Sequence, residues 1–430
     1  MKKVSGYFSG VFSIPNSVYV ITGEVNLGGA TEEVASNCVL TFEGGCCKNG
    51  TLKGNMTLVE ALPSKQIFDG ISLQGTWSNT ESFVEWFGAR GDGIFDDGPA
   101  LNAIFTSPFM RVCLQNKEYQ VGSKPIGKRV GLEVTSPKQI VGVSIYDKGT
   151  TIKAKSNVDF EALLLISSSQ VELSNLKMLG TDKVKDLITT YLDGDSYRFV
   201  SKLQFYNVSV FTCSRTCVRL STFLSTLKRV SCAFCSVGIE LHGNVPTYIR
   251  GTSTILEQCY VQFASLYGYR LDYMSYSKLE SCCMDYAGKN RPEALSWSNV
   301  NTAYPYYISA SDTLTLNSCA CEMSYNAIRL YHCRAIHINS FSDWSSKDKE
   351  GEGHNPRLQI YLKDCWGVRF TTCFMGSELT PPKKLVTGSI IDSERIVFDR
   401  SLLRKEEGRM SNNFWQEENV DILRSSVEFQ

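Results

Sequence analysis

Apolar and polar residues alternate in short runs along most of the chain, and the runs share one pattern. The pattern reads apolar, any, apolar, any, any, apolar, any, apolar. Alternation with a period of two predicts a strand that buries one face. The two-residue step in the middle predicts a bend, because small hydrogen-bonding residues occupy it. Clear copies are Leu203-Phe205-Val208-Val210, Leu314-Leu316-Cys319-Cys321 and Val368-Phe370-Cys373-Met375.

The copies recur at intervals of about 22 to 37 residues, which is typical of a solenoid whose repeats stack on one another. A further apolar strand precedes many copies, as in residues 238–241 and 328–330. Three short strands per coil predict an all-β, single-stranded parallel β-helix of about ten coils with right-handed crossovers. One inward column is predicted to hold Leu173, Phe205, Leu256, Leu279, Leu316, Ile338 and Phe370, with Arg229 taking the same place in a weaker copy.

Residues 84–105 have the sequence VEWFGARGDGIFDDGPALNAIF. Gly91, Asp92 and Gly93 predict a tight turn, and Asp97 followed by proline predicts the start of a short helix over 97–107. This stretch closely resembles the opening motif of the pectate-lyase superfamily, except that Gly98 stands where that motif has a small hydroxyl residue. The resemblance implies a right-handed parallel β-helix, with one short capping helix, that binds or acts on polysaccharides.

Residues 1–80 differ from the rest, because their alternating strands are broken by Gly and Asn. They resemble the small N-terminal β module of relatives in the same superfamily. We therefore predict a β module over 1–80 and the β-helix over 81–430. The last repeat ends close to Gln430, so we expect no large C-terminal domain.

Composition excludes several classes of protein. The 430 residues include 44 basic and 44 acidic side chains, and zero net charge gives no support for a nucleic-acid partner. No run approaches the roughly 18 apolar residues that a membrane span needs. The first residues lack the apolar segment of a secretion signal, so we do not expect a secretory leader.

The 16 cysteines allow two interpretations. Cys213, Cys217, Cys232 and Cys235 could form metal-binding knuckles. Cysteine is also a small core residue, and one apolar position of successive repeats holds Cys232, Cys259, Cys282, Cys319 and Cys373. We therefore predict reduced structural thiols, no metal and no cofactor. Reduced thiols suit synthesis in a cytosol.

Three repeats carry insertions, at residues 181–199, 287–306 and 343–357. Each follows the last strand of its coil, so the insertions should emerge at one corner, where per-repeat insertions commonly build a binding face. We predict that aromatic side chains there contact a glycan, and the predicted substrate-binding residues are Trp297, Tyr304, Tyr306 and Trp344. The alternative is that the insertions are solvated loops.

One outward position near those insertions is occupied by Gln262, Asp285, Glu322 and Trp344 on four successive coils. Because rungs are about 4.8 Å apart, Asp285 and Glu322 should stack as neighbouring carboxylates, at a separation close to that of a retaining glycosidase pair. We predict them as the catalytic acids, and the alternates are Asp193, Asp195 and Asp343. The other interpretation is an ordinary polar ladder.

The preceding strand of each coil carries charged residues at an equivalent outward position. Alternating signs favour a structural ladder made of Arg219, Glu240, Arg270 and Arg329. His242, His332 and His337 lie at strand ends without the spacing to a carboxylate that would mark a triad. We interpret these histidines as structural.

Three functions fit the chain. The first, implied by the resemblance, is a phage tailspike-like or tail-fibre protein that binds a bacterial surface polysaccharide, with or without cleaving it. It would be a homotrimer in the virion, made in the host cytoplasm, with residues 1–80 available to other tail or baseplate proteins. The second is a bacterial lyase or glycoside hydrolase of the same superfamily, secreted or at the cell surface. The third is a non-catalytic structural or adhesion protein.

Overall fold

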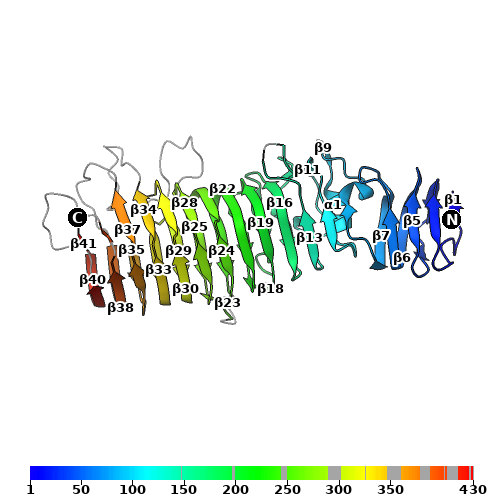
Figure 1. Cartoon of the computed structure of the whole chain (residues 1–430). Coiled ribbons are helices and arrows are strands. Elements are labelled where there is room, and N and C mark those ends of the chain that lie inside the picture. Colours follow the sequence, from blue (N-terminus) through cyan, green and yellow to red (C-terminus); the bar gives the residue numbers. More distant parts are fainter. Residues whose placement is uncertain are drawn as a thin grey trace. The chain divides into compact units, whose positions relative to one another are not determined.

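The computed structural model describes residues 1–146, 148–195, 199–243, 249–288, 302–324, 326–345, 360–377, 388–400, 402–403, 415–425 and 428–429. The chain forms two compact units, Met1–Leu179 and Gly180–Gln430. Parallel strands dominate both units, and the described residues contain one α-helix, α1 (Gly98–Phe105). Figure 1 shows the strands of each unit side by side. The predicted parallel β-helix is confirmed.

The first unit begins with seven strands that pair with one another and with no later strand in the described part of the chain. All of these pairs are parallel, and β6 contacts four of the other six strands. The strands are β1 (Lys2–Val4), β2 (Val18–Ile21), β3 (Glu24–Asn26), β4 (Thr31–Glu33), β5 (Val39–Phe42), β6 (Cys46–Glu60) and β7 (Phe68–Trp77). The proposed module boundary at residue 80 stays a prediction.

The opening motif has partly the predicted structure. The strand β9 (Asp92–Asp96) replaces the predicted turn, although Gly91 and Gly93 keep positive φ angles of 61° and 74°. The helix α1 follows as predicted, but Asp97 does not cap it through its side chain. The Asp97 carboxylate instead accepts hydrogen bonds from the amides of Arg90 and Gln120, at 2.7 and 3.3 Å. Asp97 therefore joins the motif to the following coil.

The rest of the first unit continues with short strands in parallel pairs. The elements are β8 (Ser82–Phe83), the 3₁₀ helix η1 (Val84–Phe87), β10 (Arg111–Cys113), β11 (Glu118–Val121), β12 (Val130–Val134), β13 (Lys138–Val141), β14 (Thr151–Ala154), β15 (Phe160–Ile166) and β16 (Val171–Leu179).

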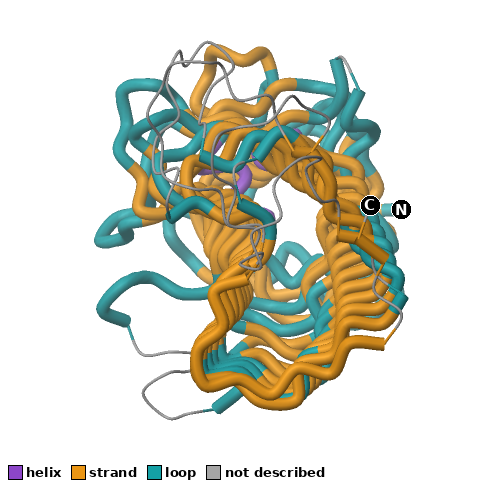
Figure 2. The backbone as a smooth tube through the Cα atoms, turned by 90° about the vertical axis from the view of Figure 1, so that its left-hand side faces the viewer, coloured by secondary structure: helices purple, strands orange, loops and turns teal. Residues whose placement is uncertain are grey.

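The second unit has three stacks of parallel strands, and Figure 2 shows successive coils lying one over another. Stack 1 consists of β17 (Val184–Thr189), β20 (Thr216–Leu220), the ends of β22 (Thr226–His242) and β25 (Tyr260–Asp272), β29 (Tyr304–Ser309), β32 (Ile328–Tyr331), β35 (Ile360–Lys363) and the starts of β38 (Gly388–Asp399) and β40 (Trp415–Ser425). Stack 2 consists of the starts of β19 (Gln204–Phe211) and β22, then β24 (Ile255–Glu257), β27 (Lys278–Glu280), β30 (Asp312–Asn317), β33 (Arg334–Asn339), β36 (Arg369–Thr371) and the ends of β38 and β40.

Stack 3 completes each coil. It consists of the end of β19, the middle of β22, the start of β25, β28 (Cys283–Asp285), β31 (Ala320–Glu322), β34 (Ser342–Ser345), β37 (Phe374–Ser377), β39 (Leu402–Leu403) and β41 (Glu428–Phe429). Two-residue strands lie at a further corner, namely β18 (Val200–Ser201), β21 (Thr222–Phe223), β23 (Gly251–Thr252) and β26 (Met274–Ser275).

The inward column of stack 2 confirms the predicted register for most coils. The residues in register, all of them buried, are Phe205, Leu227, Leu256, Leu279, Leu316, Ile338, Phe370 and Phe398. Leu227 takes the place predicted for Arg229, so that assignment is wrong by two residues. Arg229 is exposed at the bend, in the left-handed region with a φ of 55°. Leu173 belongs to the first unit, where it pairs with Ile140.

A column of cysteines lines the corner after that bend. Each thiol lies 3.4 to 3.6 Å from a carbonyl oxygen of the preceding coil, and the pairs are Cys259 with Leu227, Cys282 with Leu256, Cys319 with Leu279 and Cys373 with Ile338. A thiol is a weak donor, so these contacts satisfy it inside the core. Cys232 does not belong to this column, because it pairs with Val261 in stack 3. Cys232 lies two residues beyond the position that the repeat assigned to it, as Arg229 does.

We expect the purified protein to contain less than about 0.1 zinc ion per chain, because zinc binds thiolates rather than thiols. None of the 16 cysteines forms a disulfide bond, and most are buried. Burial raises the pKa of Cys213 and Cys282 well above the usual value, which disfavours their thiolates. Metal analysis of protein purified without chelator, together with a thiol count under denaturing conditions, checks this. Stoichiometric zinc would show that the knuckle interpretation is correct.

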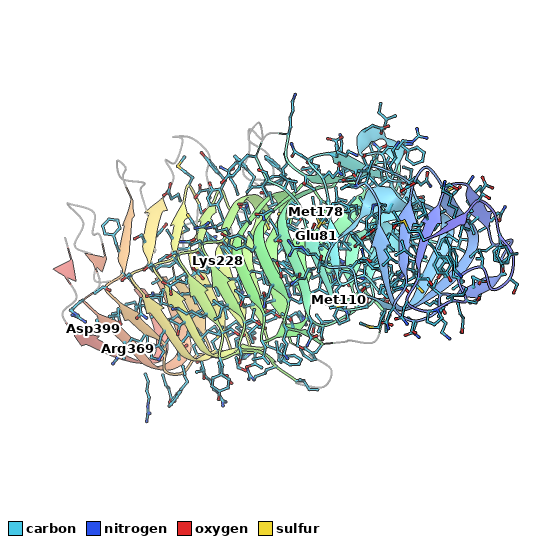
Figure 3. All side chains as sticks on the ribbon, turned by 45° about the vertical axis from the view of Figure 1, so that its right-hand side comes forward. Glu81, Met110, Met178, Lys228, Arg369 and Asp399 are labelled. Carbon is cyan, nitrogen blue, oxygen red and sulfur yellow. The ribbon has the colours of Figure 1, made fainter. Side chains whose placement is uncertain are left out.

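The outer faces of the stacks carry polar rows. Figure 3 shows Lys228 on such a face, and its ammonium nitrogen lies 2.6 Å from Glu257 Oε1 on the next coil. No helix among the described residues is both long and apolar enough to span a membrane.

Candidate functional site

Asp285 and Glu322 occupy neighbouring rungs of stack 3. Asp285 pairs with Gln262 on one side and with Glu322 on the other, and Glu322 pairs with Trp344. The preceding residues in the strands, Met284 and Cys321, are buried. Asp285 is half-buried and Glu322 is exposed. The predicted outward register is therefore confirmed, and we call Asp285 with Glu322 the carboxylate pair.

Asp285 lies in surroundings that favour its protonated form. The Tyr260 hydroxyl donates a hydrogen bond to Asp285 Oδ2, and the Cys283 sulfur lies 3.6 Å from Oδ1. Burial raises the pKa of the Asp285 carboxyl, although these two hydrogen bonds act in the opposite direction. A carboxyl whose pKa is raised by burial suits a general acid.

Three aromatic rings stack beside the carboxylate pair, on consecutive coils. Phe234 and Phe263 have ring centroids 5.5 Å apart and nearly parallel planes, and Phe263 and Tyr286 are 4.7 Å apart. Each ring belongs to a corner residue with positive φ. We call these three residues the corner stack. We did not predict it, but the chain carries a signal, since an aromatic residue directly follows Gln262 and Asp285.

Two of the four aromatic residues predicted to contact a glycan, Tyr304 and Tyr306, are buried in the core. Tyr306 lies in β29 and is fully buried, and its ring stacks on Tyr269 with centroids 5.1 Å apart. Its hydroxyl donates to carbonyl oxygens of Cys282 and Ala320, at 2.7 and 2.8 Å. Tyr304 is also buried, and burial raises its pKa to about 12. Both residues are strand residues because the insertion ends earlier than predicted.

Two further predicted contacts fall outside the described side chains. Trp297 lies in the undescribed range 289–301, and only the backbone of Trp344, in β34, is described. Residues 346–359 are also undescribed, so the predicted common corner of the insertions stays a prediction. The insertion predicted at 181–199 includes the strand β17 and is shorter than expected.

The three alternate acids lie in different surroundings. Asp343 is in β34, in register with Cys321 and Met375, and its side chain is buried. Its predicted position in an emergent loop is therefore wrong. Asp193 is exposed and forms ion pairs with Arg215 and Arg219. Asp195 is exposed in a turn that its amide closes on the Leu192 carbonyl, at 3.2 Å.

A second polar row follows the outer face of stack 1. We call it the outer row, and it consists of Arg219, Glu240, Arg270, Tyr307, Arg329 and Tyr361 in register. The predicted equivalence of its four charged residues is confirmed. Glu240 Oε1 lies 3.8 Å from Arg219 Nε and 3.9 Å from Arg270 Nη1. Opposite charges on neighbouring strands stabilise such a ladder.

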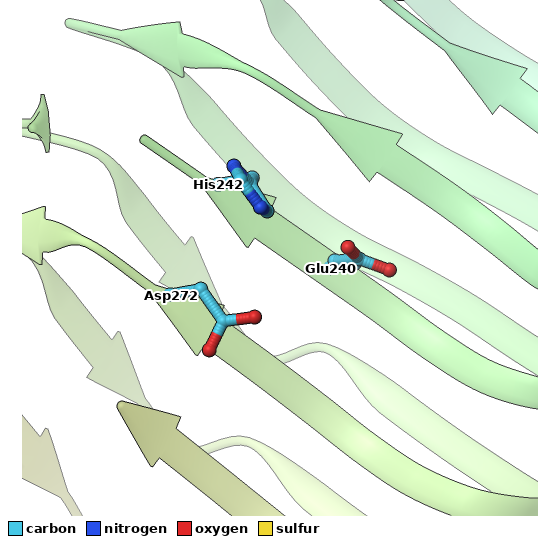
Figure 4. A group of neighbouring side chains, drawn as sticks. All are labelled: Glu240, His242 and Asp272. Carbon is cyan, nitrogen blue, oxygen red and sulfur yellow. The ribbon is translucent and has the colours of Figure 1, made fainter. Parts of the chain in front are cut away.

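Glu240, His242 and Asp272 come together at one end of this row (Figure 4). Possible ligand atoms of the three residues lie within 4.8 Å of one another, and all three residues are buried. His242 and Asp272 are register partners, and His332 Nδ1 lies 3.4 Å from Asp364 Oδ2. Two of the three histidines therefore have a carboxylate neighbour that their spacing along the sequence did not indicate. The partners in each pair are one coil apart along the chain, so the sequence alone does not show that they are close.

This cluster does not have the character of a cation site. Both oxygens of Asp272 already accept hydrogen bonds, from Arg270 Nε at 2.6 Å and from the Ser309 hydroxyl. The guanidinium groups of Arg219 and Arg270 also lie close to Glu240. Since these groups supply the positive charge that a metal would bring, the cluster is balanced without one.

Comparison with known proteins identifies the fold. No family model and no curated protein sequence matches the chain. The tailspike gp42 of Acinetobacter phage vb_AbaP_AS12 is similar with a TM-score of 0.54 at 11% identity, over 85% of this chain and 66% of the tailspike chain. The A-module of mannuronan C-5 epimerase AlgE6 from Azotobacter vinelandii is similar with a TM-score of 0.50 at 13% identity, over 81% of this chain and 99% of the module. At such low identities the likeness concerns the parallel β-helix alone.

Proposed function

We propose that the protein is a phage tailspike-like protein that binds a bacterial surface polysaccharide and cleaves it. The observation that carries the proposal is the carboxylate pair beside the corner stack, because carboxylates and flat apolar rings recur there from coil to coil. Rungs about 4.8 Å apart present such groups repeatedly to a linear polymer. The parallel β-helix shared with a phage tailspike supports the same function.

In this proposal Asp285 is the general acid and Glu322 is the nucleophile. Burial raises the pKa of Asp285, which helps it to hold the proton that the leaving oxygen needs. Glu322 is exposed on the next coil, where a sugar can reach it. Their strands are neighbouring rungs, and a rung spacing of about 4.8 Å is compatible with the roughly 5 to 5.5 Å between the carboxyl groups of retaining glycosidases. Phe234 and Tyr286 are half-buried, so part of each ring can contact the C–H groups of a sugar, whereas Phe263 is buried between them.

The decisive experiment is an array of purified bacterial capsular and O-antigen polysaccharides, followed by product analysis on each polymer that binds. We expect binding to a small number of polymers and release of oligosaccharides with a retained anomeric configuration. Products with a new carbon–carbon double bond would indicate a lyase and contradict the assigned roles. Binding without any cleavage would show that the protein is a non-catalytic adhesin.

We also propose a homotrimer in the virion, with residues 1–80 contacting other tail or baseplate proteins. Homo-oligomers with closed symmetry are the rule among soluble assemblies. Light scattering at micromolar concentration should give about three times the chain mass of 48.0 kDa. A monomer at that concentration would contradict the tailspike-like assembly. It would not affect the proposed polysaccharide binding, which the polysaccharide array tests separately.

A further inference from the structure

Arg329 lies among tyrosine rings at the far end of the outer row. The centre of its guanidinium group is 4.8 Å from the ring centroid of Tyr361, 5.6 Å from that of Tyr304 and 5.7 Å from that of Tyr307. Tyr307 and Tyr361 are its register partners on the two adjacent coils. Both rings are half-buried, so each keeps a part of its surface accessible. Rings in this arrangement hold a cation by attraction to their faces.

Arg329 differs from the other arginines of the outer row because no carboxylate among the described residues pairs with it. Arg219 forms ion pairs with Asp193 and Glu240, and Arg270 forms one with Asp272. Within the described part of the chain Arg329 forms no ion pair, and its buried Nε has no hydrogen-bond partner. A partly buried guanidinium without an anion carries a desolvation cost that ring faces offset only in part.

A second cation, Lys363, lies on the same face, one coil further on. Lys363 follows Tyr361 by two residues in β35, and the residue between them, Leu362, is buried. Lys363 therefore projects outward like Tyr361, and it is half-buried. Tyr331 is its register partner. Among the described residues Lys363 also forms no ion pair. We call Arg329, Lys363, Tyr307 and Tyr361 the cationic end of the outer row.

We propose that the cationic end binds the carboxylate of an acidic sugar, so that the polysaccharide recognised by the protein is a carboxylated one. The inference rests on the proposed polysaccharide-binding function and names its substrate class. A planar guanidinium fork matches the two oxygens of a carboxylate, and Lys363 adds a point charge on the neighbouring rung. The rings of Tyr307 and Tyr361 offer faces to the C–H groups of the same sugar.

The test compares each polysaccharide with its own carboxyl-reduced form. Wild-type protein is applied to capsular polysaccharides that contain uronic acid, to the same polymers after carboxyl reduction, and to capsular polymers whose only anions are sulfate or phosphate. We expect binding to a uronate polymer, loss of that binding after carboxyl reduction, and weaker binding as salt rises, because salt screens a half-exposed ion pair. This comparison uses only the wild-type protein, so its result does not depend on whether a variant folds.

Variants assign the effect to the cationic end. Arg329→Gln should weaken binding of the uronate polymer about 10- to 100-fold, the range for losing a hydrogen bond to a charged group. Arg329→Lys keeps the charge without the fork and should have an intermediate effect, and Lys363→Gln a smaller one. Lys228→Gln is the matched control, because Lys228 is a paired surface cation of stack 2, and it should bind like the wild type. Circular dichroism checks that each variant is folded.

The outcomes separate the two proposals. Equal binding to native and carboxyl-reduced polymer, equal binding to the sulfated or phosphorylated polymers, or an unchanged affinity in folded Arg329→Gln would overturn the carboxylate site and leave the polysaccharide-binding function standing. Binding to no polymer of the array would overturn the proposed function and this inference with it.

Discussion

Asp285→Asn and Glu322→Gln are each expected to lower the turnover of the cleaved polysaccharide by about 10² to 10⁴, the range for losing an acid–base group. Asn at position 285 cannot release a proton to the leaving oxygen, and Gln at position 322 cannot act as the nucleophile. Binding should survive, because neither change touches the corner stack. The measurements are initial rates of reducing-end release and the affinity on the same polymer.

Stability measurements distinguish a catalytic effect from unfolding. Burial raises the pKa of Asp285 in the folded state. The protonated carboxyl therefore favours the folded state at low pH, and this contribution to the free energy of unfolding is lost as pH rises through the raised pKa. Asn does not ionise, so Asp285→Asn should be at least as stable as the wild type at neutral pH, and this advantage should vanish in acid. Denaturant unfolding at neutral and acidic pH checks the sign.

Glu280→Gln is the matched control for both variants. Glu280 lies on the same coil as Asp285, but in stack 2, where Lys278 and Asn317 hold its carboxylate. Its replacement should leave turnover unchanged. If Asp285→Asn and Glu322→Gln also leave cleavage unchanged, the carboxylate pair is an ordinary polar ladder. The catalytic acids would then have to be sought among Asp193, Asp195, Glu240 and Asp272, or at a subunit interface.

The repeat pattern predicted the fold because burial in a β-helix has a strict period. An inward residue at one rung faces an inward residue at the next, and alternation along each strand is visible without knowledge of the coil length. The same logic placed Asp285, Glu322 and Trp344 on neighbouring rungs, and those pairings are observed. The register errors have an equally simple cause. A slip by one residue would exchange the two faces, whereas the slip by two at Arg229 and Cys232 preserves the alternation and is therefore invisible in it.

The site was harder to predict because it depends on where insertions begin and end. Tyr306 belongs to a strand, yet it follows a long insertion and was assigned to it. The proximity of His242 to Asp272, and the position of Lys363 one coil after Arg329, depend on coils of unequal length. Alternation locates strands, but it does not give the length of the segment that joins them. The register pairs supply that length, and only once they are known is it apparent that no described carboxylate pairs with Arg329.

The second large effect concerns the core. Leu316→Ala is expected to lower the free energy of unfolding of the second unit by about 2 to 5 kcal/mol, because it leaves a cavity in a close-packed column. Leu316 is fully buried between Leu279 and Ile338 on the adjacent coils. A solenoid contacts only neighbouring repeats, so no distant element can collapse into the space. Denaturant unfolding followed by circular dichroism measures the loss, and hydrogen exchange in β30 should show that the opening begins there.

Thr315→Ala is the control that tests the assigned face rather than the size of the side chain alone. Thr315 precedes Leu316 in the same strand, and it is half-buried between Lys278 and His337 on the outer face. Because alternate residues of a strand point to opposite faces, removing this side chain opens no cavity in the core and should cost less than about 1 kcal/mol. Equal losses for the two variants would contradict the inward column, and with it the register that places Asp285 beside Glu322.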